Sequence, residues 1–161
     1  MRQKKFAGLS SNKVLKDAVL VLALKSIRLD PELAYGYGLL GNIYAIDLDD
    51  TKTGLAYIEK AIQLDPHDPD FLAGKGSILA DKQNNHIEAL GFYGEALQKE
   101  PSESYVWLLR LIGLSYLRVG EFELAEQFYN EALELQPDAL LFLAELSHKK
   151  GEFPTPEMIR T

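Results

Sequence analysis

The chain has 161 residues and a formal net charge of −7, and 47% of its residues are apolar. This composition is typical of a folded chain, and the acidic balance argues against nucleic acid and anionic membrane surfaces as partners, because both attract clustered Lys and Arg. The sequence has no cysteine, which excludes disulfides, thiolate zinc sites and a cysteine nucleophile.

The first residues are too polar for the apolar core of a signal peptide. The most apolar stretch, Val14–Leu24, is interrupted by Lys16 and Asp17 and is shorter than the roughly 20 residues that a membrane-spanning helix needs. We therefore expect a soluble chain with no membrane insertion. Its expected location is the cytoplasm, or the periplasm if a leader has been removed.

Apolar residues at helical spacing predict a lone helix over about 13–29, which ends before Pro31. Each of the next three segments carries two predicted helices separated by a polar or glycine break. These pairs cover about 31–46 with 52–64, 69–81 with 86–99, and 102–119 with 122–135. One more helix is predicted over about 138–149, and no stretch shows the alternation of a strand bounded by hairpin turns.

Prolines divide this series of helices at a fixed interval. Pro31, Pro66, Pro101 and Pro137 are spaced 35, 35 and 36 residues apart, and each follows a similar run such as Ala61-Ile-Gln-Leu-Asp. A fixed period of this length indicates a repeat architecture, in which stacked helix pairs bury one continuous core.

The period gives the expected organisation of the chain. Residues 13–150 form the repeat array, and the remaining residues are tails. The expected segments are an N-terminal tail (1–12), a lone helix (13–31), three full repeats (32–66, 67–101 and 102–137), a last helix (138–150) and a C-terminal tail (151–161).

The repeats resemble those of the tetratricopeptide repeat family, whose helix-turn-helix unit of about 34 residues has small, aromatic and proline residues at fixed places. The repeat over 102–137 matches best, through Ile112-Gly113, Tyr116, Gly120, Ala125, Tyr129, Ala132 and Pro137. The earlier repeats carry Gly41, Ala61 and Pro66, and then Gly76, Ala96 and Pro101. The resemblance covers about Val14–Lys149 and implies an all-α, right-handed α-solenoid of about three full units with flanking helices.

Two departures from the family pattern concern length. The repeats over 32–66 and 67–101 are one residue longer than the family unit, and we place the extra residue near the break between their helices. The repeat over 102–137 carries two extra residues before Trp107. The small residues are expected where two helices cross closely, so that their backbones can approach.

One glycine-rich stretch suggests a nucleotide site. Gly36-Tyr-Gly38-Leu-Leu-Gly41 matches the G-x-G-x-x-G of dinucleotide-binding folds, but the residues before it begin a helix and do not form a strand. We therefore interpret Gly36 and Gly38 as positions that loosen the helix or let a ligand or neighbouring helix come close. No cofactor is predicted.

Acidic and histidine side chains do not suggest a metal site. Asp47-Leu-Asp-Asp50 lacks the glycine and glutamate of an EF-hand calcium loop, and His67, His86 and His148 lie in different repeats. No Ser/His/Asp set follows from the spacing either. We predict no metal, no catalytic residue and no enzyme activity.

The resemblance implies that the first helices of successive repeats line a concave groove, which receives a peptide or helical segment of another protein. Carried over by position, the groove residues are Tyr35, Gly38, Asn42, Ser77, Trp107, Arg110, Leu114 and Arg118, with Ala45, Ala73, Ala80 and Glu145 as further lining. Trp107 could equally be a core aromatic, and Tyr35 and Arg110 could equally be ordinary surface residues.

The predicted function is that of a protein–protein interaction scaffold or adaptor. Some family members hold the carboxylate end of a chaperone with a Lys/Asn/Lys/Arg clamp; Asn42 matches one clamp residue, but Gly38 stands where a lysine is expected. The groove therefore suits a partly apolar segment with an acidic contact. Two alternatives stay open: a structural subunit or assembly factor that forms homo-oligomers through incomplete end repeats, and a regulatory module of a separate enzyme.

Overall fold

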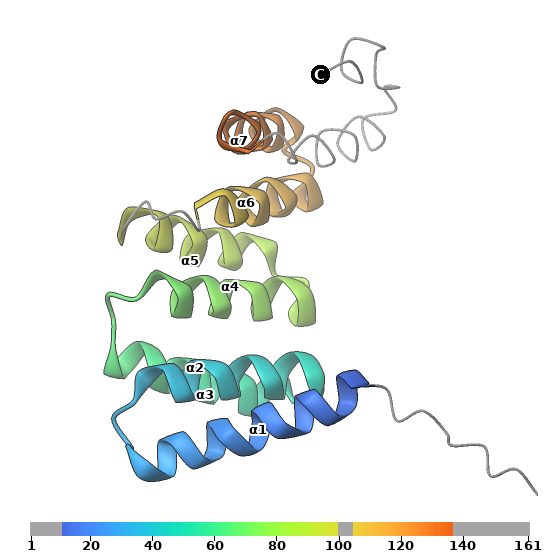
Figure 1. Cartoon of the computed structure of the whole chain (residues 1–161). Helices are drawn as coiled ribbons and strands as arrows, with labels where there is room; N and C mark the ends of the chain where they lie inside the picture. The colour runs from blue at the N-terminus through green and yellow to red at the C-terminus, as the bar shows by residue number, and fades with distance from the viewer. Residues whose placement is uncertain (1–10, 100–104, 137–161) are drawn as a thin grey trace, which may run out of the picture. The chain divides into compact units, whose positions relative to one another are not determined.

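The computed structural model describes residues 11–99 and 105–136, which form α-helices and one π-helix and contain no strand (Figure 1). This confirms the predicted all-α fold. The predicted last helix over 138–150 and the C-terminal tail lie outside the described residues. The predicted N-terminal tail, 1–12, overlaps the first helix, which begins at Ser11.

The chain divides into two compact units, Met1–Pro66 and His67–Thr161. The first contains α1 (Ser11–Leu29), α2 (Ala34–Asn42), a π-helix (Ile43–Asp47) and α3 (Thr51–Leu64). The second contains α4 (Pro69–Gln83), α5 (His86–Lys99), α6 (Tyr105–Val119) and α7 (Phe122–Leu135). Within the first unit α2 packs against α1 and α3; within the second, α5 packs against α4 and α6, and α6 against α7.

Each helix pair crosses at a glycine on its first helix. The pairs are Gly41 with Ile58, Gly76 with Tyr93, and Gly113 with Tyr129. A Cβ atom added to Gly76 would lie 2.6 Å from the Tyr93 ring, and one added to Gly113 would lie 2.5 Å from the Tyr129 ring. These separations leave no room for a side chain, which explains the small residue at this place.

Small residues on the second helices serve the same crossings. Ala61, Ala96 and Ala132 are completely buried, as expected for positions where two backbones approach closely. The branched or aromatic residue one turn earlier is also buried, with Ile58, Tyr93 and Tyr129 at most 1% exposed. The periodic residues of the sequence therefore build the core of each pair.

The turns between paired helices show where the extra residues lie. Each turn contains one residue in the left-handed region: Asp49 at φ 57°, Asn84 at φ 52° or Gly120 at φ 87°. The next residue donates its backbone N–H to a carbonyl six residues back in the first two turns (Asp50 to Tyr44, Asn85 to Leu79) and five residues back in the third (Glu121 to Tyr116). The additional residue therefore lies in the turn, as the sequence predicted.

The first of these turns differs from the expected helix. The sequence predicts one helix over about 31–46, but the α-helix ends at Asn42 and the backbone continues as a π-helix over Ile43–Asp47. The N–H of Leu48 donates to the carbonyl of Ile43, 3.1 Å away and five residues back. A π-turn takes up an extra residue without ending the helix. The α4–α5 turn closes over the same six residues without one, so the π-helix is particular to the first pair.

Candidate functional site

An open pocket of about 260 Å³ lies in the first compact unit, between α1 and the segment formed by the end of α2 and the π-helix. Its walls are mostly apolar. The lining residues are Lys16, Val19, Leu39, Asn42, Ile43, Ile46 and Asp47. Across the rim, the Lys16 ammonium donates to the Asp47 carboxylate, so an ion pair ties α1 to the π-helix.

The π-helix shapes one side of this pocket. Asn42 is the last residue of α2, and Ile43, Ile46 and Asp47 belong to the π-turn that follows. Ile46 stays 50% exposed, which is unusual for a large apolar side chain beside a packed helix pair. Pi-turns are frequent at functional sites, and here the turn places an amide and an aliphatic side chain at one opening.

Three of the predicted groove residues belong to this unit. Tyr35 is 67% exposed and Asn42 is also exposed, so both side chains can meet a ligand. Gly38 is buried. Among the three, Asn42 alone lines the pocket.

Four predicted residues lie along α6 in the second unit. Trp107, Arg110, Leu114 and Arg118 follow one another at intervals of three or four residues and therefore share one face of the helix. Both arginines are exposed, and Trp107 and Leu114 are half-buried. We call these four residues the α6 stripe. The helix buries its other sides, with Leu109 completely inaccessible.

The last predicted residue, Ser77, lies on α4, which also packs against α6. The hydroxyl of Tyr93 donates to the Ser77 hydroxyl at 3.3 Å. Burial raises the pKa of Tyr93, so this hydroxyl keeps its proton and remains a donor. Ser77 is half-buried and one side of its hydroxyl faces the core of the α4–α5 pair.

The predicted alanine lining of the groove is wrong. Ala45, Ala73 and Ala80 are at most 7% exposed, so all three are core positions. The reason is clearest for Ala45: a Cβ atom added to Gly54 on α3 would lie 2.6 Å from the Ala45 methyl group, which shows that Ala45 faces the helix crossing. The further predicted residue Glu145 lies outside the described residues.

Sequence reasoning missed a polar contact between α5 and α6. The Nδ1 atom of His86 lies 3.4 Å from the hydroxyl of Ser115, which is only 2% exposed. Burial and the neighbouring positive charge of Arg118 lower the pKa of His86, while Asp81 on α4 acts in the opposite direction. The neutral ring is therefore favoured. No sequence pattern pointed to this pair, because the two residues are 29 positions apart.

The residues considered for metals and nucleotides have other contacts in the structure. Asp47 pairs with Lys16, and the Asp50 carboxylate caps α3 by accepting the N–H of Thr53 at 3.1 Å. Hydrogen bonding to Thr53 lowers the pKa of Asp50. In the described ranges no three His, Asp or Glu side chains gather closely enough to hold a metal ion.

The glycines of the nucleotide-like motif serve helix packing. Gly36 lies against α1, where a Cβ atom would come within 2.6 Å of the Ser26 hydroxyl, and Gly41 lies against Ile58 of α3. The motif sits inside α2, with no strand before it in the described residues. Among the helices that the structure describes, none has the length and apolar character needed to cross a membrane.

Two curated proteins show what the chain is similar to. It is 32% identical over 115 residues to the human protein O-mannosyl-transferase TMTC1, a match that covers 69% of this chain and 13% of that protein. It is 33% identical over 102 residues to the photosystem I assembly protein Ycf3 of Acaryochloris marina, covering 59% of this chain and 60% of that protein. The chain therefore spans only part of the length of both relatives.

Solved structures share the fold at low sequence identity. PilW, a type IV pilus biogenesis factor, aligns with a TM-score of 0.74 and 17% identity over 89% of this chain and 72% of its own. The first tetratricopeptide domain of Spaghetti (RPAP3), bound to the HSP90 peptide SRMEEVD, aligns with a TM-score of 0.65 and 19% identity over 73% of this chain and 90% of its own.

Family models identify the repeats directly. Two models described as tetratricopeptide repeat match residues 34–68 and 106–139. These segments contain the crossings of Gly41 with Ile58 and of Gly113 with Tyr129. Residues 34–68 and 106–139 are tetratricopeptide repeats.

Proposed function

We propose that this chain is a protein-interaction scaffold that binds a peptide segment of a partner on the open faces of its first helices. The α6 stripe carries this proposal. It joins a half-buried tryptophan and leucine to two exposed arginines on one helix face, while the remaining sides of α6 are buried. Tryptophan and arginine are the residues that contribute most often to protein interfaces.

The stripe favours one kind of peptide. Trp107 and Leu114 offer apolar area, and Arg110 and Arg118 can each pair with a carboxylate through two parallel N–H groups. A segment with an apolar side chain flanked by Asp or Glu would match this order. The HSP90 peptide held by the Spaghetti domain, SRMEEVD, has this composition, which supports the same class of ligand here.

Ser77 would contribute a hydroxyl beside the stripe, from α4. In the first unit, Tyr35, Gly38 and Asn42 form a separate candidate surface, and the pocket beside Asn42 would accept one aliphatic side chain of a ligand. Gly38 is buried, so it would shape this surface through helix packing and not through contact with the ligand.

The experiment is a selection from a library of random peptides displayed on phage, followed by titration calorimetry with the enriched peptide. We expect enriched sequences to combine apolar and acidic residues. The double variant Trp107→Ala/Arg110→Ala should weaken binding of the enriched peptide by about 30-fold or more, because the loss of even one interface residue of this type often costs about 2 kcal/mol.

The matched control is Lys60→Ala, which removes an exposed cation from α3, a second helix. It should leave binding unchanged. Far-UV circular dichroism should show equal helical content in all variants. If the double variant binds the peptide as tightly as the original chain, the α6 stripe is not the site.

The relation to an O-mannosyl-transferase favours a second candidate function, an interaction module of an enzyme. In this case the repeats would hold a protein substrate or partner, and catalysis would belong to another region or chain. A full enzyme carrying Trp107→Ala/Arg110→Ala would then modify its protein substrate more slowly while a short peptide substrate reacts normally. Equal loss with both substrates would argue against the module.

A further inference from the structure

One face of α1 is apolar and exposed. Val21 and Leu22 are each 63% exposed and Leu29 is 72% exposed, while Ala18 and Lys25 on the same face are also exposed. These five residues follow one another at helical spacing, and we call them the α1 outer face. The opposite side of α1 packs against α2 through Ala23 and Ile27. Exposed apolar residues gathered on one helix face mark an interaction site more often than scattered ones do.

The repeat period shows what this face corresponds to. The run before Pro31 repeats before Pro66, Pro101 and Pro137, so α1 is in register with the second helices α3, α5 and α7. Leu22 lies nine residues before its proline. The residues at the same distance from the later prolines are Tyr57, Phe92 and Phe128.

Each of these three aromatic residues contacts the first helix of its own pair. The Tyr57 ring lies 6.3 Å from that of Tyr37 on α2, and the Phe128 ring stacks 5.5 Å from that of Tyr116 on α6. The Lys75 ammonium lies 4.7 Å above the Phe92 ring. All three aromatics are half-buried, whereas Leu22 is mostly exposed. At the Leu22 position the α1 outer face therefore exposes a side chain that a first helix covers in the other pairs.

A first-helix sequence recurs near the end of the chain. Phe142-Leu143-Ala144 begins five residues after Pro137, as Phe71-Leu72-Ala73 of α4 begins five residues after Pro66. A small residue, Ser147, stands ten residues after Pro137, where Gly76 stands ten residues after Pro66. By sequence, residues 138–150 are thus of the type that packs against a second helix.

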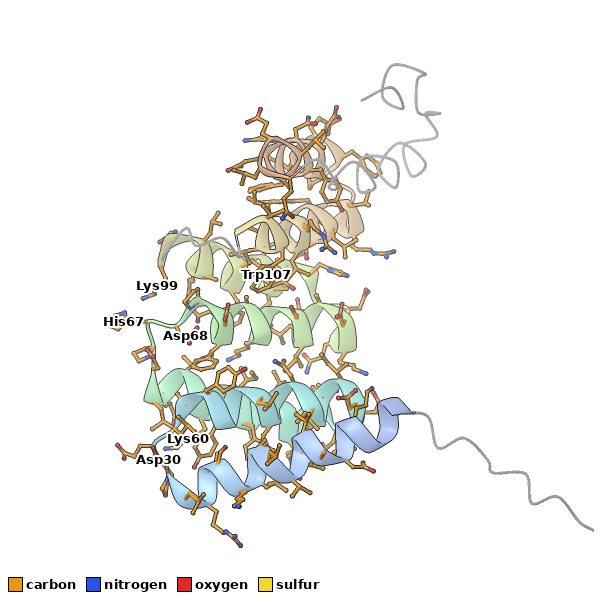
Figure 2. The ribbon with its side chains drawn as sticks, in the orientation of Figure 1. Asp30, Lys60, His67, Asp68, Lys99 and Trp107 are labelled. Atoms are coloured by element: carbon orange, nitrogen blue, oxygen red, sulfur yellow. The ribbon has the colours of Figure 1, made fainter. Side chains whose placement is uncertain are left out.

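The basic end of α1 has an acidic counterpart in the first part of residues 138–150. In the α2–α3 pair, Lys60 near the end of α3 lies at the same end as Asp30, which precedes α2 (Figure 2). In the α4–α5 pair, Lys99 at the end of α5 lies at the same end as Asp68, which precedes α4. In α1, Lys25 takes the place of Lys60 and Arg28 lies one turn further on. Asp138 and Glu145 are the charged residues in the first part of the 138–150 segment, and Lys149 and Lys150 lie at its end.

We propose that the α1 outer face of one copy binds residues 138–150 of a second copy, which complete a helix pair between the two chains. The contact joins different surfaces of the two copies, so it leaves one α1 outer face and one 138–150 segment available and can add further copies. This self-association is separate from peptide binding on α6 and does not depend on it, because the two contacts use different helices.

Analytical ultracentrifugation of the full chain over a wide range of concentration tests the proposal. The original chain should show reversible association. Leu22→Lys, in the α1 outer face, and Leu146→Glu, at the position that corresponds to Lys75, should each weaken association by about tenfold or more, since each buries a charge in an apolar contact. The control Ile87→Lys replaces another exposed apolar residue, on α5, and should associate normally.

An equimolar mixture of Leu22→Lys and Leu146→Glu provides the decisive test. Each variant retains one intact surface. The mixture should therefore form dimers, but no assembly larger than a dimer. Should Leu146→Glu fail to fold by circular dichroism, a synthetic peptide of residues 136–150 replaces it: the peptide should bind the original chain and not Leu22→Lys. A monomeric original chain at every concentration, or normal association by Leu22→Lys, would overturn the proposal.

Discussion

The helix pairs α2–α3 and α6–α7 solve the same packing problem with different numbers of residues. Both cross where a glycine of the first helix meets a large residue of the second, Gly41 with Ile58 and Gly113 with Tyr129. The α6–α7 turn closes with a hydrogen bond to a carbonyl five residues back, whereas the turn after the π-helix closes six residues back. The crossing is thus maintained while the turn accommodates the insertion.

The comparison teaches which parts of a repeat are constrained. Two backbones that approach within contact distance leave no freedom at the crossing residues, because any added atom meets a buried side chain. A turn is held in place only where it joins the two helices, so it can accommodate one extra residue. In α2–α3 the turn follows a π-helix, whose side chains line the pocket beside Asn42.

The largest expected effect comes from removing the large residue of each crossing. Tyr129→Ala should lower the free energy of unfolding by about 3–5 kcal/mol, and Ile58→Ala by about 2–5 kcal/mol, because each leaves a cavity at a buried site. The chain has one tryptophan, Trp107, in the second unit. Its fluorescence during urea unfolding should therefore respond to Tyr129→Ala, while circular dichroism reports both variants. An unmoved fluorescence transition in Tyr129→Ala would show that the two crossings are not equivalent.

A smaller loss is expected when a small crossing residue is enlarged. Ala96→Leu and Ala132→Leu should each cost roughly 1–3 kcal/mol, since both positions are completely buried and the added carbons have no space. Ala56→Leu, on the exposed side of α3, is the matched control and should change stability little. If both crossing variants unfold at the same urea concentration as the control, the helix register is wrong.

The smallest effect concerns the contact of His86 on α5 with Ser115 on α6. Because the pKa of His86 is lower in the folded chain than its ordinary value of 6.5, the unfolded chain binds the proton first as the pH falls. The stability of the folded state is therefore unaffected by His86 above pH 6.5. It falls as the pH drops from 6.5 toward the lowered pKa of His86 in the folded chain. The groups facing His86 from its neighbours are Arg118 and Ser115 on α6 and Asp81 on α4.

Thermal unfolding of the original chain and of His86→Gln at neutral and mildly acidic pH measures this contribution. The original chain should lose more stability on acidification than the variant, and His67→Gln, which changes an exposed histidine, should behave as the original. A variant that loses as much stability as the original chain would show that another group causes the pH dependence.

The sequence by itself determined the repeats, their helices and their crossings. Gly41, Gly76 and Gly113, with Ala61, Ala96 and Ala132, recur in phase because close packing permits only small side chains at those places, and this constraint is visible in the amino-acid order. The position of the extra residue in the turns followed from the same count. The exposed positions of Tyr35, Asn42, Arg110 and Arg118 agree with the predicted first-helix surface, whose role in binding stays a prediction.

Tertiary structure alone decided the features that depend on neighbours distant in the chain. Ala45, predicted for the groove, faces Gly54 instead, because the direction of a side chain near a helix end depends on how the turn is built. The π-helix, the Lys16–Asp47 ion pair and the His86–Ser115 contact each join residues whose proximity comes from packing and leaves no periodic trace. The exposure of Leu22 likewise became informative only beside the covered rings of Tyr57, Phe92 and Phe128.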